Sequence, residues 1–294
     1  MESVKDVIAR FAARGRAEPE KSAEAPKLLP NRHPVRDFFV AEVLDCAIKD
    51  DRHSMEHPVF SLSKKKDIRE RFYEHNGIKI TITPSAKGIA TIWDKDILIF
   101  AVSQLVAALN AGHQVLTPVI RLTAYDLLVT TNRHTGGGDY DQLQKAFERL
   151  AGTRITTDIR TNGIRQREGF GLIDSWKIIE KHPNNGRMAA VELRLSDWLF
   201  NAIVGYEVLT LNREYFRLSG GLERRLYELA RKHCGYQEHW RVALDLLHKK
   251  SGSGGNMREF RRKIKGIASA NHLPDYRLEY EAPADIVDFC RKDV

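Results

Sequence analysis

The sequence predicts an α+β protein made of two tandem winged-helix domains, each a helix-turn-helix followed by a β-hairpin wing. Two features predict this fold. Apolar residues at helical spacing form a helix, a turn and a second helix twice, within residues 123–151 and within residues 240–270. After each helix pair, runs of alternating apolar and polar residues flank short turns, as in β-hairpins. This order of elements is typical of a winged helix.

We divide the 294-residue chain into three parts. Residues 1–36 are rich in Ala, Glu, Pro and charge, so we expect a flexible arm there. Residues 37–217 form the N-terminal winged-helix domain, and residues 218–294 form the C-terminal one. A hydrophobic content of 42% in a chain of this length is enough for two cores.

The N-terminal domain begins with a predicted hairpin and a long helix. The runs 78–83 (IKITIT) and 88–93 (GIATIW) alternate in hydrophobicity, and Pro-Ser-Ala-Lys joins them as a turn. An apolar helix then starts at Asp94 or Asp96 and ends near Asn110.

Two capping patterns mark the helix pair of this domain. Thr123, with Asp126 three residues later, is expected to cap the first helix. Asp139, with Gln142 three residues later, is expected to cap the second. The outer face of the second helix carries Asp141, Lys145, Glu148 and Arg149. A surface with both positive and negative charges holds phosphate poorly, so we expect this helix to contact protein, in a homodimer for example, or to position the domain.

Two Asn-Gly pairs then predict hairpins, because both residues accept positive φ. They are Asn162-Gly163 and Asn185-Gly186. Three basic residues surround the first tip: Arg160, Arg165 and Arg167. Two interpretations of this wing remain: it contacts the backbone or minor groove of a nucleic acid, or it is a solvated hairpin tip.

The C-terminal domain repeats the order of the first. We expect helices over residues 221–234 and 240–250, followed by the turn Ser-Gly-Ser-Gly-Gly and a third helix over residues 256–270. A terminal hairpin joins residues 276–280 and 285–290.

The third of these helices is amphipathic and basic. Asn256 caps it, with Glu259 three residues later. Met257, Phe260, Ile264, Ile267 and Ala268 share one face. The opposite face carries Arg258, Arg262 and Lys265, with Arg261 and Lys263 at the boundary. Such a helix fits the major groove of DNA, where Arg binds guanine or phosphate. The alternative is a charged face that only meets water.

Charge favours DNA. The chain has a net charge of +8, and residues 218–294 carry half of this excess, with 15 Lys or Arg against 11 Asp or Glu. The phosphate-loop pattern GxxxxGK is absent from the glycine-rich turn. We therefore predict double-stranded DNA as the partner. The candidate contacts in the C-terminal domain are Lys249, Lys250, Ser251, Asn256, Arg258, Arg261, Arg262, Lys263 and Lys265.

Other function classes are disfavoured. No run approaches 18 apolar residues, which argues against a membrane span. The three cysteines are far apart, as in a reduced cytoplasmic protein. The His-x-His metal pair that nicking initiators need is absent among the 11 histidines. We expect no enzymatic activity, no metal and no cofactor.

Long stretches match one family. From about residue 38 to the C-terminus, the chain resembles the plasmid replication initiator protein A family. The stretches include residues 54–67 (SMEHPVFSLSKKKD), 90–100 (ATIWDKDILIF), 122–133 (LTAYDLLVTTNR), 167–176 (REGFGLIDSW), 195–203 (LSDWLFNAI) and 214–235 (EYFRLSGGLERRLYELARKHCG).

The resemblance implies a protein that binds origin repeats, helps to open the duplex, and recruits host factors such as the host replication initiator and the replicative helicase. It also implies two winged-helix domains, of which the C-terminal one supplies the main major-groove helix. On this chain that helix is 256–270. The alternative is a two-domain winged-helix transcription repressor, because the same fold serves both functions.

Overall fold

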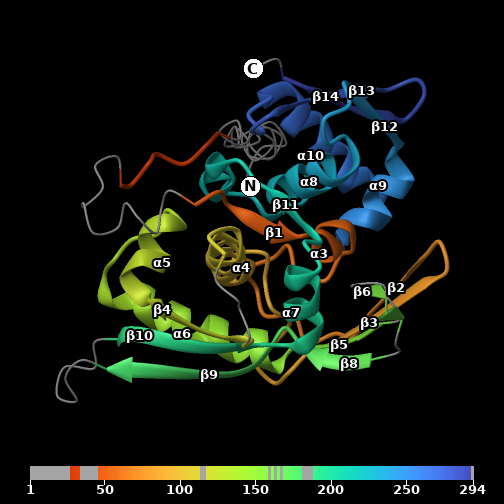
Figure 1. Cartoon of the computed structure of the whole chain (residues 1–294). Helices are drawn as coiled ribbons and strands as arrows, with labels where there is room; N and C mark the ends of the chain where they lie inside the picture. The colour runs from red at the N-terminus through yellow and green to blue at the C-terminus, as the bar shows by residue number, and fades with distance from the viewer. Residues whose placement is uncertain are drawn as a thin grey trace, which may run out of the picture.

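Two units with the same order of helices and strands make up most of the structure, a mixed α+β fold (Figure 1). The first unit contains α4 (Lys95–Asn110), β4 (Val119–Thr123), α5 (Ala124–Thr130), α6 (Gly137–Gly152), β9 (Ile173–Glu180) and β10 (Met188–Leu195). The second contains α8 (Gly221–His233), β12 (His239–Ala243), α9 (Leu244–Ser251), α10 (Met257–Ala270), β13 (Tyr276–Glu281) and β14 (Ile286–Arg291). This computed structural model describes residues 27–33, 46–112, 117–157, 160–161, 164–165, 168–180 and 188–292.

The sheets of the two units also correspond. Their strand orders are β4-β10-β9 and β12-β14-β13, and all pairs are antiparallel. In each unit, the strand before the helix pair therefore joins the last strand of the hairpin. The helix pairs expected from the sequence lie at the predicted places, but the C-terminal domain has a strand, β12, where we expected the start of a helix.

Two of the predicted helix caps are present and one is wrong. The backbone N–H of Asp126 donates to the Thr123 hydroxyl at 3.2 Å, and the N–H of Glu259 donates to the Asn256 side chain at 2.9 Å. Helix α6 begins earlier than expected, with Gly136 at the N-cap instead of Asp139. None of the described helices is both long and apolar enough to cross a bilayer.

A four-stranded sheet is inserted in the first unit and has no counterpart in the second. Its order is β2-β3-β5-β8, from β2 (Arg71–His75), β3 (Ile78–Thr83), β5 (Arg154–Thr157) and β8 (Glu168–Gly171). The short strands β6 (Arg160–Thr161) and β7 (Ile164–Arg165) extend the β5–β8 hairpin.

The predicted pairing of residues 78–83 with 88–93 is wrong. Strand β3 pairs instead with β2, through a turn at Asn76 and Gly77 whose φ angles are 51° and 75°. Positive φ at both turn residues matches the twist of a two-residue hairpin, and Asn-Gly accepts it with little strain. Residues 88–93 lead into α4 and form only isolated bridges.

The remaining elements lie where the two units meet. They are β1 (Lys49–Asp51), α3 (Arg52–Glu56), α7 (Asp197–Val204), β11 (Val208–Thr210) and the 3-10 helix η1 (Arg213–Arg217). Strands β1 and β11 pair with each other. The core of the second unit extends beyond residues 218–294, because Ile48, Met55, Ile99 and Leu211 pack into it.

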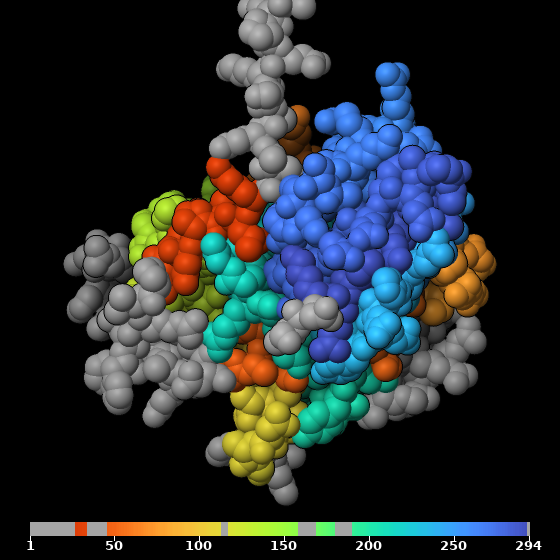
Figure 2. Space-filling model, turned by 90° about the horizontal axis from the view of Figure 1, so that it is seen from above, coloured from red at the N-terminus to blue at the C-terminus, as the bar shows by residue number. Residues whose placement is uncertain are grey.

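Residues 27–33 do not form part of a flexible arm. The backbone N–H of Leu29 donates to the Arg217 carbonyl at 2.8 Å, and the Arg217 guanidinium donates back to the Leu29 carbonyl at 2.6 Å. A ring nitrogen of His33 lies 2.7 Å from the carbonyl oxygen of Arg133. Figure 2 shows this segment in red on the surface of the molecule. The rest of the predicted arm, and the start of the folded region near Asp37, lie outside the described residues.

Candidate nucleic-acid interface

Helix α10 has the two faces that the sequence predicts. Phe260, Ile264 and Ile267 are buried in the core of the second unit. Burial of this stripe fixes the rotation of the helix about its axis, so the opposite side faces solvent. The side chain of Asn256 accepts the N-cap hydrogen bond from the Glu259 N–H, so it stabilises the start of α10.

The exposed side of α10 carries two arginines for which the described part of the chain provides no partner. Arg258 and Arg262 are exposed, and no hydrogen bond or ion pair of either guanidinium is found within the described residues. They lie four residues apart, so their side chains are neighbours on one helix face. Both guanidinium groups are therefore free to bind a ligand from solvent.

The other cations of α10 are engaged locally. The Arg261 guanidinium donates to the Asp285 carboxylate at 2.7 Å and lies 3.2 Å from the Tyr280 hydroxyl. This hydrogen bond from Arg261 lowers the pKa of Asp285. Lys263 pairs with Glu259 at 2.8 Å on the solvent side. Arg261 thus ties α10 to the β13–β14 hairpin and is less available for DNA than Arg258 and Arg262.

Lys265 lies over an aromatic ring. Its ammonium group is 5.5 Å from the centroid of Tyr280, a cation–π distance. The side chain is exposed, so the ammonium group still faces solvent.

The three predicted phosphate contacts at the end of α9 separate into one surface residue and two buried residues. Lys249 is exposed. Lys250 is 5% exposed, and its Nζ lies 3.3 Å from His233 Nε2 and 3.8 Å from a Glu56 carboxylate oxygen. Ser251 is fully buried and donates its hydroxyl to the His248 carbonyl at 2.7 Å.

The assignment of Lys250 and Ser251 to DNA is therefore wrong. Burial lowers the pKa of Lys250, as expected for an ammonium group removed from water. For Ser251, a signal of burial is present in the sequence, because Leu244, Leu247 and Ser251 recur at spacings of three and four, which places them on one inward face.

A groove of about 530 Å³ lies between the β2–β3 hairpin and the α9–α10 turn. Lys249 and Arg69 both line it, and the Arg69 side chain is 78% exposed while it pairs with Asp67 at 3.0 Å. Gly252 closes α9 with a φ of 68°, and a Cβ there would lie 2.6 Å from Pro58. Sequence reasoning missed Arg69, because it belongs to the other unit and only the fold brings it to this turn.

Helix α6, the counterpart of α10, presents a different surface. The Arg149 guanidinium donates twice to the Asp94 carboxylate, at 2.7 Å each, and Glu148 pairs with Lys87 at 3.0 Å. Asp141 and Lys145 remain exposed. The charge on α6 is thus largely neutralised within the first unit.

The basic hairpin of the first unit is the two-stranded sheet β6-β7, between strands β5 and β8 of the inserted sheet. Arg160 and Arg165 are in β6 and β7, and the hairpin that corresponds to β13–β14 is β9–β10 instead. The side chains of these two residues, and Arg167 altogether, lie outside the described residues. Their contact with DNA stays a prediction.

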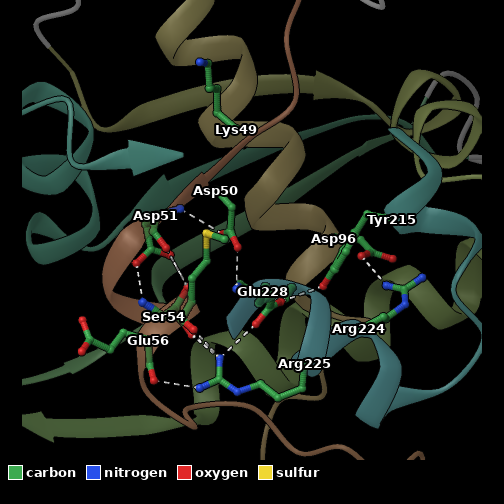
Figure 3. A network of polar contacts seen from close by, with 12 residues as sticks. Lys49, Asp50, Asp51, Ser54, Glu56, Asp96, Tyr215, Arg224, Arg225 and Glu228 are labelled. Carbon is green, nitrogen blue, oxygen red and sulfur yellow. Dashed lines mark hydrogen bonds and ion pairs between the residues drawn. The ribbon is translucent and has the colours of Figure 1, made fainter. Parts of the chain in front are cut away.

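A buried network of charges joins the two units (Figure 3). Lys95, at the start of α4, is fully buried and lies 2.6 Å from the Asp50 carboxylate and 3.0 Å from that of Glu228 in α8. Burial alone lowers the pKa of Lys95, but Asp50 and Glu228 outweigh it and raise this pKa above its ordinary value. The two carboxylates thus favour the protonated lysine, while burial raises the pKa of Asp50.

Two arginines of α8 complete this joint. Arg224 pairs with Asp96 at 2.6 Å. Arg225 pairs with Glu228 at 3.1 Å and donates to the carbonyls of Met55 and Lys250 at 2.8 and 2.9 Å. The network links α4, α8 and α9 with the segment that contains α3, so the two units are held in one orientation.

The family model described as "Replication initiator protein A" matches residues 49–278. A protein of Wigglesworthia glossinidia brevipalpis, described as "Putative replication protein", is 36% identical over 271 residues, which is 92% of this chain and 98% of the relative.

Two solved structures share the fold. Both contain domains 2 and 3 of RctB. One, a selenomethionine derivative, superposes with a TM-score of 0.58 at 13% identity and covers 82% of this chain and 98% of its own. The other, RctB-155-483, has a TM-score of 0.51 at 15% identity and covers 80% and 95%.

Proposed function

Because the chain belongs to the replication initiator protein A family, we propose that it starts plasmid replication by binding repeated DNA sequences at the origin. It binds them through two winged-helix units, acts in the cytoplasm, and has no catalytic activity and no cofactor of its own. The identical order of elements and sheet strands in the two units supports this assignment.

The observation that carries the proposal is the outer face of α10. It combines a buried apolar stripe with two exposed arginines, Arg258 and Arg262, that have no partner within the described residues. A helix of this kind enters the major groove, which admits one α-helix, and each guanidinium binds the two acceptors on one guanine edge.

Phosphate contacts position this helix. Lys249 and Arg69 flank the α9–α10 turn from opposite sides of the groove, and both side chains reach solvent. Phosphate contacts hold the protein in register without reading sequence. Of the three candidates at the end of α9 (Lys249, Lys250 and Ser251), only Lys249 is proposed to contact phosphate.

Opening of the duplex follows from binding energy. DNA that is bent or underwound contacts more protein surface than straight DNA, so tight binding favours the distorted form. The exposed mixed-sign face of α6 contacts protein: a second copy of the chain, the host replication initiator or the replicative helicase.

The test is a footprint of the full chain on the parent replicon. We expect protection of tandem repeats, and we expect the double variant Arg258→Ala/Arg262→Ala to lose it. The matched control is Arg154→Ala, which removes an exposed arginine of β5 in the other unit. A single protected palindrome, with no strand opening when the host initiator is added, indicates a transcription repressor instead.

A further inference from the structure

A second cavity, of about 590 Å³, lies where the two units and the N-terminal segment meet. Its walls come from five parts of the chain that are distant in sequence. These are residues 29–32, 64–66, 87–96, 131–149 and 216–224. A volume of this size is typical of a site for a small molecule.

The cavity is strongly cationic. Eight Lys or Arg residues line it against three Asp, a net charge of +5. The sequence hides this concentration, because six of the eight cations lie within residues 37–217, which carry 24 basic and 23 acidic side chains and are close to neutral as a whole. The fold gathers these cations from segments that are distant in sequence, and two of the three lining carboxylates form ion pairs with lining arginines.

The inner wall of the cavity is neutralised by ion pairs. Asp94 receives two hydrogen bonds from Arg149, at 2.7 Å each. Asp96 binds Arg224 at 2.6 Å and Arg133 at 3.2 Å. These carboxylates are fully engaged and do not repel an anion that enters.

The rim carries the excess charge. No acidic partner is found within the described residues for the side chains of Arg32, Lys64, Lys65 and Lys66. Lys64 places its ammonium group 4.9 Å from the ring centroid of Trp93, which also lines the cavity. The rim therefore offers several cations beside one aromatic face.

The backbone that carries these lysines is fixed. The N–H of Ile89 donates to the Asp67 carbonyl at 2.8 Å. Gly88 has a φ of 95°, and a Cβ there would lie 3.1 Å from the Lys66 side chain and 3.2 Å from the Asp67 carbonyl oxygen. Only glycine permits this close approach, which holds the lysine segment against the cavity wall.

The shape and charge together select the ligand. A net +5 calls for an anion of several charges, and a cavity of about 590 Å³ is too small for a DNA duplex. Trp93 and the apolar side chains of Leu29 and Ile89 suit a flat, weakly polar group. We propose that this cavity binds a nucleoside polyphosphate, with the phosphates on the lysine rim and the base against Trp93.

Both units contribute to this cavity, so the ligand reports on how they are joined. Lys64 and Arg133 belong to the first unit, and Ser219 and Arg224 lie at the start of the second. A ligand that binds only this assembled form stabilises it by a free energy that grows with the logarithm of the ligand concentration once this exceeds the dissociation constant. We expect the melting temperature to rise with added nucleotide.

The experiment is calorimetric titration of the full chain with adenosine triphosphate. The test variant is Lys65→Ala/Lys66→Ala, which removes two exposed rim cations. The matched control is Lys79→Ala/Lys177→Ala, which removes two exposed lysines that do not line the cavity. We expect a dissociation constant at least tenfold weaker for the test variant and unchanged for the control.

Three further titrations decide the ligand class. Adenosine monophosphate is expected to bind at least tenfold more weakly than the triphosphate, and inorganic tripolyphosphate also more weakly because it lacks the base. Equal affinity of both variants for the triphosphate overturns the site. Equal binding of tripolyphosphate and nucleotide overturns the role of Trp93. If a single-stranded oligothymidine binds and adenosine triphosphate does not, the cavity binds the phosphates of a DNA strand, and the nucleotide proposal is overturned.

Discussion

Helices α10 and α6 occupy the same position in two units of the same topology, but they present different electrostatic surfaces. On α10, Arg258 and Arg262 face solvent without a partner within the described residues. On α6, Arg149 is held by Asp94 inside the first unit, and Lys145 shares the exposed face with Asp141. The shared topology therefore does not imply a shared task, and the side chains on the outer helix face decide it.

Breaking the joint between the two units has the largest expected effect on stability. Lys95→Met removes the cation that pairs with the buried Asp50 carboxylate and leaves Glu228 with Arg225 as its remaining cation. Removing one partner from a buried charge network costs about 3–5 kcal/mol. We expect this loss in the free energy of unfolding, measured by urea denaturation. The exposed Lys145→Met is the control and is expected to stay within about 0.5 kcal/mol of the parent. Equal stabilities refute a structural joint.

Removing one arginine from α10 tests whether this helix reads sequence. A bidentate contact between Arg and guanine is worth about 1–3 kcal/mol of discrimination, so we expect Arg262→Ala to reduce the ratio of specific to non-specific affinity by a matching factor. Binding to cognate and scrambled duplexes across a salt series measures it. If both affinities fall in equal proportion, α10 contacts only the backbone.

Lys249 and Lys250 are adjacent in sequence and provide a sharper contrast. Lys249 is exposed, so Lys249→Ala is expected to weaken cognate and scrambled binding alike and to lower the salt slope by about one unit. Lys250 is buried beside His233 and Glu56, so Lys250→Met is expected to lower the melting temperature with no change in salt slope. The reverse pattern contradicts the assignment of Lys249 to phosphate.

Charge reversal on α6 is expected to have the smallest effect on DNA binding. Lys145→Glu changes an exposed side chain of a helix assigned here to protein contact. We expect altered self-association in sedimentation velocity and an unchanged preference among DNA sequences. A changed base preference with unchanged assembly refutes this assignment.

Local signals made the helix pairs predictable. Thr123 and Asn256 bind backbone N–H groups three residues later, and such bonds depend only on neighbouring residues. The apolar stripe of α10 is equally local, and the structure buries Phe260, Ile264 and Ile267 as the helical spacing requires. These features also identified Arg258 and Arg262 as exposed.

Long-range pairing was not predictable in the same way. Strand β3 pairs with both β2 and β5, and β5 is more than 70 residues away in sequence. The local signal Asn76-Gly77 was present, but the alternating run 88–93 drew the prediction to the wrong partner. Residues 88–93 are instead mostly buried at the entrance to α4, where apolar residues serve core packing and not strand alternation.

Burial of charged residues was the least visible feature of the sequence. Lys95 and Lys250 look like surface residues beside acidic and basic neighbours, and only the fold supplies the partners that remove them from water. The cationic cavity is hidden for the same reason, because six of its eight lysines and arginines come from residues 37–217, whose total charge is nearly zero.

The buried joint around Lys95 fixes the distance between the two units. If a flexible linker joined the two units, each unit could bind the groove separately. An insertion of ten base pairs between their contacts, about one helical turn, would then keep both contacts on the same face of the duplex. A rigid joint does not lengthen by the roughly 34 Å that this insertion adds. If both units contact one repeat, the permitted spacing is set by Asp50, Lys95 and Glu228, far from any base.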